Sequence, residues 1–163
     1  MDNIITYAET CLDTFDQRPF CDVDSLILSC LAYLDIPAEL ANGRTWRGMR
    51  LADLYRAEHF ERLFSVTFAP QKTRHLLTAL AASPRFRDIR VMGYTSTVDE
   101  LREKQFSAMT FRLAPKLSYI AFRGTDSTLV GWKEDFNMAF RTPIPAQQAA
   151  RVYLTTASLH CPG

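Results

Sequence analysis

The spacing of hydrophobic residues changes at Pro84, and this change constrains the fold more than any other feature of the sequence. Before Pro84, apolar residues recur at the three- to four-residue spacing of amphipathic helices. The helices that this spacing predicts cover residues 4–15, 23–34, 51–56 and 71–82. Residues 1–84 are therefore expected to form a helical amino-terminal segment.

After Pro84 the pattern becomes extended, with segments rich in β-branched and aromatic residues at 89–96, 106–113 and 117–122. The linkers between them suit an antiparallel meander. The last segment is apolar on both faces, which is typical of a central strand covered by helices on both sides. We therefore predict three neighbouring strands, with residues 117–122 at the centre of the sheet.

Helical spacing returns at 129–140 and 146–159. The order of strand, polar loop and helix is that of an α/β layer, in which such a crossover normally leads to a further parallel strand. The fold predicted is α/β, with residues 1–84 as the helical segment and residues 85–163 as the first strands and crossover of a larger sheet. Together they form one incomplete domain.

Size and charge exclude several classes of protein. A chain of 163 residues allows one domain, and 47% hydrophobic residues supply ample material for a core. A formal net charge of +1 gives no general attraction to nucleic acid or to an anionic membrane. Apolar runs fall short of the roughly 20 residues of a membrane span. Because Asp2 stands where a secretory signal carries a basic residue, we expect a cytoplasmic protein.

The sequence predicts neither a metal site nor an organic cofactor. The four cysteines form no C-x-x-C pair and are expected to be reduced and mostly buried. His59 and His75 lack a second ligand at metal spacing, and neither phosphate-binding glycine motif occurs. Arg85, Arg87 and Arg90 alternate with apolar residues, which favours the solvent-facing side of a strand over a phosphate groove.

The end of the last predicted strand is the most informative segment for function. Gly124 allows a sharp backbone turn close to a ligand, and Thr125 offers an N–H group and a hydroxyl. Donors fixed in this way stabilise the negative charge that acyl transfer creates on a carbonyl oxygen. The alternative is an ordinary loop in which groups such as Asp126 and Ser127 cap the following helix.

The segment Phe122-Arg123-Gly124-Thr125, followed by Trp132 and Asp135 three residues apart, resembles the lipase class of α/β-hydrolases. The wider runs 19–28, 131–138 and 143–147 resemble a bacterial lipase-like family related to the class 3, or fungal-type, lipases. The resemblance implies an α/β-hydrolase sheet and an acyl ester or lipid substrate. It also implies that Thr125 and Gly124 belong to an oxyanion hole.

Three further residues of this region are expected to have supporting roles. Trp132 on a helix is typically part of a core, and Asp135 near a helix start favours the helix dipole. Arg123 is either a charged strand end in solvent or the partner of a carboxylate such as Asp126 or Asp135. The sequence leaves both alternatives for Arg123 open.

A hydrolase of this class also needs a serine on a Gly-x-Ser-x-Gly elbow and a later acid and histidine. No Gly-x-Ser-x-Gly occurs in the 163 residues, and His160 does not match the position of the family's catalytic histidine. We therefore expect an amino-terminal portion of a serine hydrolase with no catalytic triad of its own, inactive alone. The alternatives are a non-catalytic interaction module and a truncated or decayed gene product. Either an incomplete sheet or such a module would expose a strand edge through which the chain could self-associate.

Overall fold

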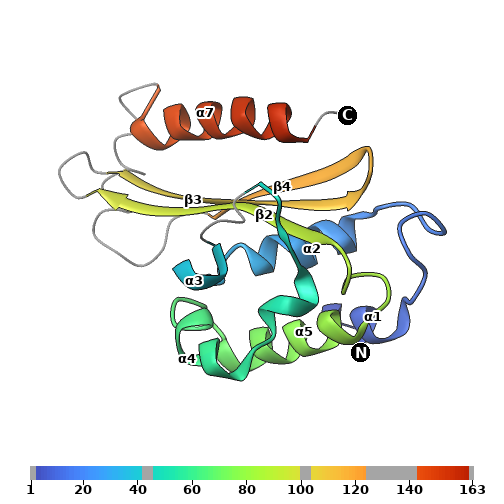
Figure 1. Cartoon of the computed structure of the whole chain (residues 1–163). Helices are drawn as coiled ribbons and strands as arrows, with labels where there is room; N and C mark the ends of the chain where they lie inside the picture. The colour runs from blue at the N-terminus through green and yellow to red at the C-terminus, as the bar shows by residue number, and fades with distance from the viewer. Residues whose placement is uncertain (1–2, 42–45, 100–103, 124–142, 162–163) are drawn as a thin grey trace.

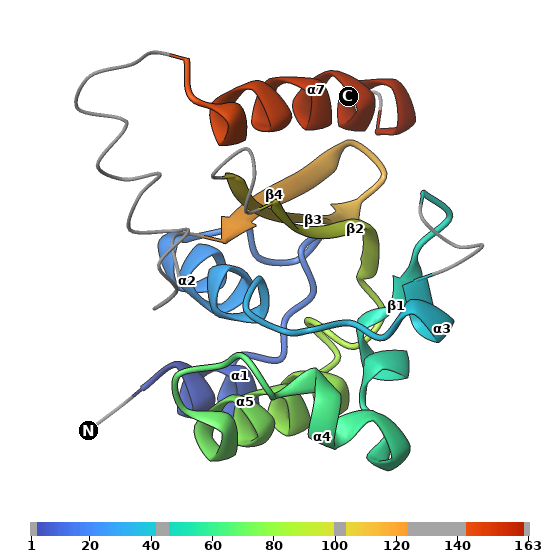
Figure 2. The same cartoon turned by 90° about the vertical axis from the view of Figure 1, so that its left-hand side faces the viewer.

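The computed structural model describes residues 3–41, 46–99, 104–123 and 143–161. These residues form three layers: a group of helices, a four-stranded antiparallel sheet, and the long helix α7 (Pro145–His160) on the opposite face of the sheet (Figure 1). The view in Figure 2 shows the same order, with α7 separated from the group of helices by the strands. The α/β class and the order of amino-terminal helices followed by strands are confirmed.

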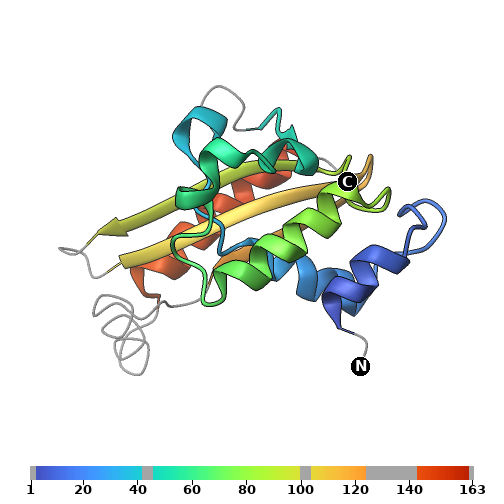
Figure 3. The same cartoon turned by 90° about the horizontal axis from the view of Figure 1, so that it is seen from below.

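The two longest helices of the helical layer are α2 (Asp22–Leu31), which contacts the sheet, and α5 (Pro70–Ala82), which contacts other helices of this layer. Pro70 stands in the first turn of α5, where its missing N–H group is tolerated. The shorter helices are α1 (Ile4–Thr10), α3 (Ala38–Ala41), η1 (Leu51–Leu54), η2 (Ala57–His59) and α4 (Phe60–Leu63). Seen from below, α1 and α5 lie side by side under the strands (Figure 3).

The helix predicted at 23–34 runs three residues past the end of α2 at Leu31, and two other helical predictions were also too long. Asn3 caps α1 by accepting hydrogen bonds from the backbone of Ile5 and Thr6, but the helix ends at Thr10 because Cys11 adopts an extended conformation. The predicted helix at 51–56 is the single 3-10 turn η1. Both segments have apolar residues at helical spacing, but their length is set by contacts with the rest of the fold.

The sheet consists of β1 (Met49–Arg50), β2 (Arg90–Asp99), β3 (Lys104–Ala114) and β4 (Leu117–Arg123), in the order β1-β2-β3-β4. Every pair is antiparallel, so the predicted meander is confirmed. The register of β2 shifts between Met92 and Thr95, where Gly93 has a φ of 64°. Because Gly93 has no side chain, Trp46 and Tyr153 can lie close to the strand at this position.

The prediction that residues 117–122 form a central strand was wrong for the described part of the chain, in which β4 lies at the edge of the sheet. Helices lie on both sides of the sheet here, α2 against β4 and α7 against β3. Apolar residues on both faces of a strand indicate that helices pack on both faces of the sheet. They do not require a hydrogen-bonded strand on each side.

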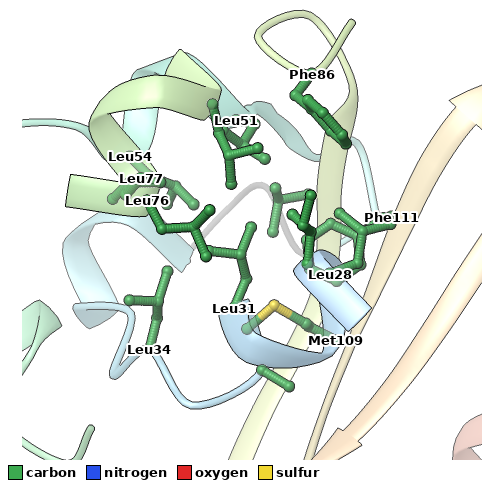
Figure 4. Close-up of a cluster of buried hydrophobic side chains, with 14 of the residues drawn as sticks. Leu28, Leu31, Leu34, Leu51, Leu54, Leu76, Leu77, Phe86, Met109 and Phe111 are labelled. Atoms are coloured by element: carbon green, nitrogen blue, oxygen red, sulfur yellow. The ribbon is translucent and has the colours of Figure 1, made fainter. Parts of the chain in front are cut away.

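The main core lies between the sheet and the helical layer. Figure 4 shows the side chains of Leu28 and Leu31 of α2 meeting Met109 and Phe111 of β3, with leucines of η1 and α5 closing the cluster. All of the labelled residues in this group are nearly or fully buried. Phe86, which lies in the turn before β2 and is fully buried, completes the cluster.

Arg85 is also buried, with 2% of its surface exposed, so the expected solvent-facing position was wrong. Its guanidinium donates to both carboxylate oxygens of Asp24, at 2.9 and 2.6 Å. It also donates to backbone carbonyls of the segment between α1 and α2, those of Asp13, Arg18 and Pro19. Residues 84–88 form turns rather than a strand, so the alternating pattern does not describe two faces of a sheet here.

The second, smaller cluster joins α7 (Pro145–His160) to the other face of the sheet. Its buried members are Phe106 and Ala108 of β3 and Tyr153 and Ala157 of α7. The Tyr153 hydroxyl shares a 2.8 Å hydrogen bond with the buried Thr110 hydroxyl. None of the helices in the described part of the chain is long and apolar enough to cross a membrane.

Candidate functional site

Of the residues to which the sequence analysis assigns an oxyanion-hole or supporting role, only Arg123 lies among the described residues. It is the last residue of β4. The other candidates lie outside the described residues: Gly124, Thr125, Asp126, Trp132 and Asp135. The geometry of the site is therefore that of the strand end from which Gly124 and Thr125 continue.

Arg123 lies directly opposite Ser107 of β3 in the antiparallel register. Residues opposite each other in such a pair point to the same face. Alternation along β4 from Ala121, a member of the main core, places Arg123 on the face that carries the helical layer. Within the described residues, the buried Nε of Arg123 and the buried Oγ of Ser107 have no hydrogen-bond partner.

A row of polar side chains continues from this pair across the sheet. Ser96 of β2 lies opposite Ser107 and is exposed. The neighbouring Tyr94 hydroxyl donates to Asp35 Oδ1 at 3.2 Å, and Arg62 Nε donates to Asp35 Oδ2 at 3.3 Å. Burial, together with the charge of Asp35, raises the pKa of Tyr94, so its hydroxyl stays protonated and donates.

Sequence reasoning missed this polar row because its members are separated by tens of residues and share no motif. The register between strands brings Ser96, Ser107 and Arg123 together. Asp35 arrives from the segment after α2. The one available signal was the break in the apolar alternation of β3 at Ser107, a polar residue on the face that otherwise carries Met109 and Phe111.

The opposite face of the same strand end is aromatic. The ring of Phe122 lies 5.9 Å from the rings of both Phe106 and Tyr153, measured between centroids. Phe122 keeps 42% of its surface exposed. The end of β4 therefore presents donors on one face and an accessible apolar surface on the other.

A groove of about 330 Å³ follows β4 on the α7 side. Lys116 supplies its charge, and Ile120 and Leu154 supply apolar surface. The complete lining is Thr110, Lys116, Ser118, Ile120, Leu154, Ala157, Ser158 and Cys161. The Cys161 thiol lies 3.8 Å from the sulfur of Met92, and no disulfide forms among the four cysteines.

The described residues contain no serine–histidine pair of the kind that activates a nucleophile. His75 lies 3.6 Å from Glu9, with both side chains largely exposed, and His160 stacks on Trp46. In the ranges that the structure describes, no group of three or more potential metal ligands occurs either. What the strand end offers is hydrogen-bond donation and apolar contact.

Comparison with known proteins gives one match. No curated protein and no solved structure matches the chain. The family model described as Mbeg1-like matches residues 80–163, which include the last turn of α5, strands β2 to β4 and α7. Because this match covers just over half of the sequence, the chain belongs to the Mbeg1-like family.

Proposed function

We propose that the chain is the amino-terminal portion of a lipase- or esterase-like serine hydrolase and that Gly124 and Thr125 supply donors of its oxyanion hole. The observation that carries this proposal is the position of Arg123 as the final residue of β4, directly before Gly124 and Thr125. The substrate class is an acyl ester or lipid. A cytoplasmic location is part of the same proposal.

The strand that precedes the proposed donors is firmly held. Residues 107–114 of β3 pair with β4 along its whole length. From the helical layer, the hydroxyls of Ser25 and Ser29 share hydrogen bonds of 2.9 and 2.8 Å with the Tyr119 hydroxyl of β4. Donors that stabilise developing charge must be fixed before the reaction, and a strand tied in this way supports such preorganisation.

The aromatic face of the strand end supports an apolar substrate group. Phe122 is exposed beside Phe106 and Tyr153, one residue away from Arg123. An acyl chain held against these rings would lie next to the backbone that continues into Gly124 and Thr125. Contact of this kind removes apolar surface from water and favours binding.

The first test uses the chain of 163 residues. Because it contains no Gly-x-Ser-x-Gly, we expect no hydrolysis of short-chain nitrophenyl esters above a buffer control and no covalent labelling by a fluorophosphonate probe. Burst kinetics together with labelling of one serine would contradict the proposal that the nucleophile lies elsewhere. A mock preparation from cells that do not express the chain, purified in the same way, controls for contaminating esterases.

The second test uses a version of the protein extended beyond residue 163 that has esterase activity. Thr125→Val keeps the volume and β-branching but removes the hydroxyl, so kcat should fall by about 10² to 10³ fold with KM nearly constant. Thr125→Ser is the matched control and should retain most of the activity. Full kcat in a correctly folded Val variant would remove the Thr125 hydroxyl from the site.

A non-catalytic interaction module is the second candidate, and the position of β4 at the edge of the sheet in the described residues favours it. Leu117 and Phe122 are exposed on this strand, and an edge strand offers backbone groups for pairing between molecules. We therefore expect self-association at about a hundred micromolar by light scattering. A reading frame that continues past residue 163 and encodes Gly-x-Ser-x-Gly favours the hydrolase, whereas a natural stop favours the module or a decayed gene.

A further inference from the structure

The pair formed by Ser107 and Arg123 has unsatisfied polar atoms in a buried position. Ser107 is only 2% exposed, and its Oγ has no partner among the described residues. The same holds for the Nε atom of Arg123 on the neighbouring strand. A buried donor or acceptor left without a partner destabilises the folded state, and more so when the group is charged. Two such atoms side by side indicate a place where a third group binds.

The chemistry of the two atoms restricts what this group is. The guanidinium of Arg123 carries donors only, and the Ser107 hydroxyl can donate as well as accept. The group that satisfies both therefore offers oxygen acceptors. Because the Cβ atoms of directly opposite residues in an antiparallel pair lie about 4.5–5.5 Å apart, a small planar group with two oxygens can reach both side chains.

Charge selects among oxygen acceptors. In the described part of the chain no carboxylate pairs with Arg123, and Asp35, which is bound to Tyr94 of β2, already receives hydrogen bonds from Tyr94 and Arg62. A partly buried guanidinium is stabilised most by one negative charge that accepts hydrogen bonds from it. A carboxylate meets this need with a single charge.

Ser96 of β2 lies opposite Ser107 and is exposed, so the sheet face beside the pair reaches solvent on the β2 side. We propose that Ser107 and Arg123 form a binding site for one carboxylate group, with Oγ of Ser107 donating to one oxygen and Nε of Arg123 donating to the other. The carboxylate belongs either to a free carboxylic acid or to an acidic side chain of the chain itself. This site is independent of the proposed hydrolase activity.

The experiment follows the Nε–Hε resonance of Arg123 by ¹H–¹⁵N NMR while sodium butyrate replaces sodium chloride at constant ionic strength. If a free carboxylate binds, the resonance shifts in a saturable way. If the chain supplies the carboxylate, the Hε proton exchanges slowly with water before any butyrate is added, and butyrate leaves the resonance in place. The Nε–Hε resonance of Arg90, an exposed arginine of β2, is the internal reference.

Variants decide between a carboxylate site and simple hydration. Ser107→Ala should weaken butyrate binding by about three- to tenfold, or speed Hε exchange by a similar factor if the carboxylate is internal. Arg123→Lys keeps the charge but loses the Nε donor, and should weaken butyrate binding at least about tenfold. Arg90→Gln is the control for loss of one positive charge. It should change neither butyrate binding nor the exchange rate of the Arg123 Hε proton.

The inference is overturned if the Arg123 Hε proton exchanges as fast as that of Arg90 and does not respond to butyrate. It is also overturned if Ser107→Ala, folded as the wild type, changes neither exchange nor butyrate binding. Esterase assays do not enter either criterion, so failure of this inference is distinguishable from failure of the hydrolase proposal.

Discussion

The two faces of the sheet are stabilised in different ways. The face toward α1, α2 and α5 carries the large core and a fully buried ion pair between Asp24 and Arg85. Among the described residues, the face toward α7 carries a smaller cluster around Phe106, Ala108, Tyr153 and Ala157, with a hydrogen bond between the buried hydroxyls of Thr110 and Tyr153. Figure 1 shows this asymmetry for the described residues, with α1, α2 and α5 below the strands and α7 above them.

The difference indicates which helices are held most firmly against the sheet. The helical layer is tied to the sheet by many apolar contacts and to itself by Arg85, which links the segment between α1 and α2 to the chain before β2. In contrast, α7 leaves Val152, Leu154 and Leu159 exposed. Its attachment depends on the fit of a few side chains around Tyr153, so changes there should act locally.

The largest expected effect is on the helical face, at Arg85. Arg85→Met leaves the Asp24 carboxylate buried and uncompensated, so the free energy of unfolding should fall by about 3–5 kcal/mol. Denaturant unfolding at pH 7 measures this change in the free energy of unfolding. The matched control is Arg87→Gln, which removes an exposed partner of Asp88 and should change the free energy of unfolding by less than about 0.5 kcal/mol.

Acid unfolding gives a second measure of the same pair. Burial raises the pKa of Asp24, but hydrogen bonds and charge from Arg85 outweigh burial and hold that pKa below its ordinary value. Stability from this pair is therefore complete above the pKa of an unfolded aspartate, near 4, and is lost as the pH falls through the lower folded value. Asp24→Asn should remove this acid dependence; an unchanged acid transition in the variant would contradict it.

The next effect is on the α7 face, at Gly93. Its φ of 64° is in the left-handed region, and a Cβ atom there would lie 2.7 Å from the Trp46 ring and from the Tyr153 hydroxyl. Gly93→Ala should therefore lower the free energy of unfolding by about 2–3 kcal/mol. Hydrogen exchange should show faster exchange in α7 than in the wild type, with α5 unchanged.

A second glycine provides the control. Gly48 has a φ of 68°, but its Cβ would meet Val91 and Met92 rather than Trp46 or Tyr153. Gly48→Ala has the same backbone strain and should destabilise the protein without a selective effect on α7. If both variants speed exchange in α7 equally, the contact of Gly93 with α7 is not what holds this helix.

Periodic features of the fold could be predicted from the sequence, and features that depend on register could not. The helices α2 and α5 and the meander of β2 to β4 follow repeated apolar spacings in single segments. Arg85 has the same apolar neighbours as an exposed strand arginine, and only the approach of α2 gives it a buried partner. Burial of a charge is a tertiary property that a local pattern does not contain.

The candidate site divides in the same way. The strand end at Arg123 was predictable because the motif is contiguous. The neighbours Ser107, Tyr94 and Asp35 were not, because each comes from a different element and only the pairing of β2, β3 and β4 aligns them. Apolar residues on both faces of β4 say nothing about its two lateral neighbours, so this pattern alone could not show that β4 lies at the edge of the sheet in the described residues.

A smaller effect is expected from Tyr153→Phe, which removes the hydrogen bond to Thr110 and leaves a buried hydroxyl without its partner. The free energy of unfolding at pH 7 should fall by about 1–2 kcal/mol. Thr110→Val combined with Tyr153→Phe removes both hydroxyls and should recover part of that loss. A double variant that is less stable than the sum of the two single ones would contradict this account.

Alkaline pH tests the same tyrosine. Burial raises the pKa of Tyr153 to about 12, partly opposed by the Thr110 hydrogen bond. The unfolded side chain ionises near pH 10, so between pH 10 and 12 the unfolded state loses its proton first and stability falls by about 1.4 kcal/mol per pH unit. Tyr153→Phe should lack this loss of stability. The contribution of Tyr153 is measured as the difference between the wild type and the variant in the free energy of unfolding as a function of pH.

The smallest effect is expected on the outer face of α7. Val152 is 66% exposed, and its replacement by Gln removes little buried surface while favouring the helix, so Val152→Gln should change the free energy of unfolding by less than about 0.5 kcal/mol. Ala157→Leu is the contrasting variant on the inner face, where 1% exposure leaves no room for a larger side chain, and should destabilise by about 1–3 kcal/mol. Both are measured at several protein concentrations. A loss above about 1 kcal/mol for Val152→Gln that grows with protein concentration would mean that a second molecule covers this face. The two faces of the sheet would then differ in the single chain but not in the assembly in solution.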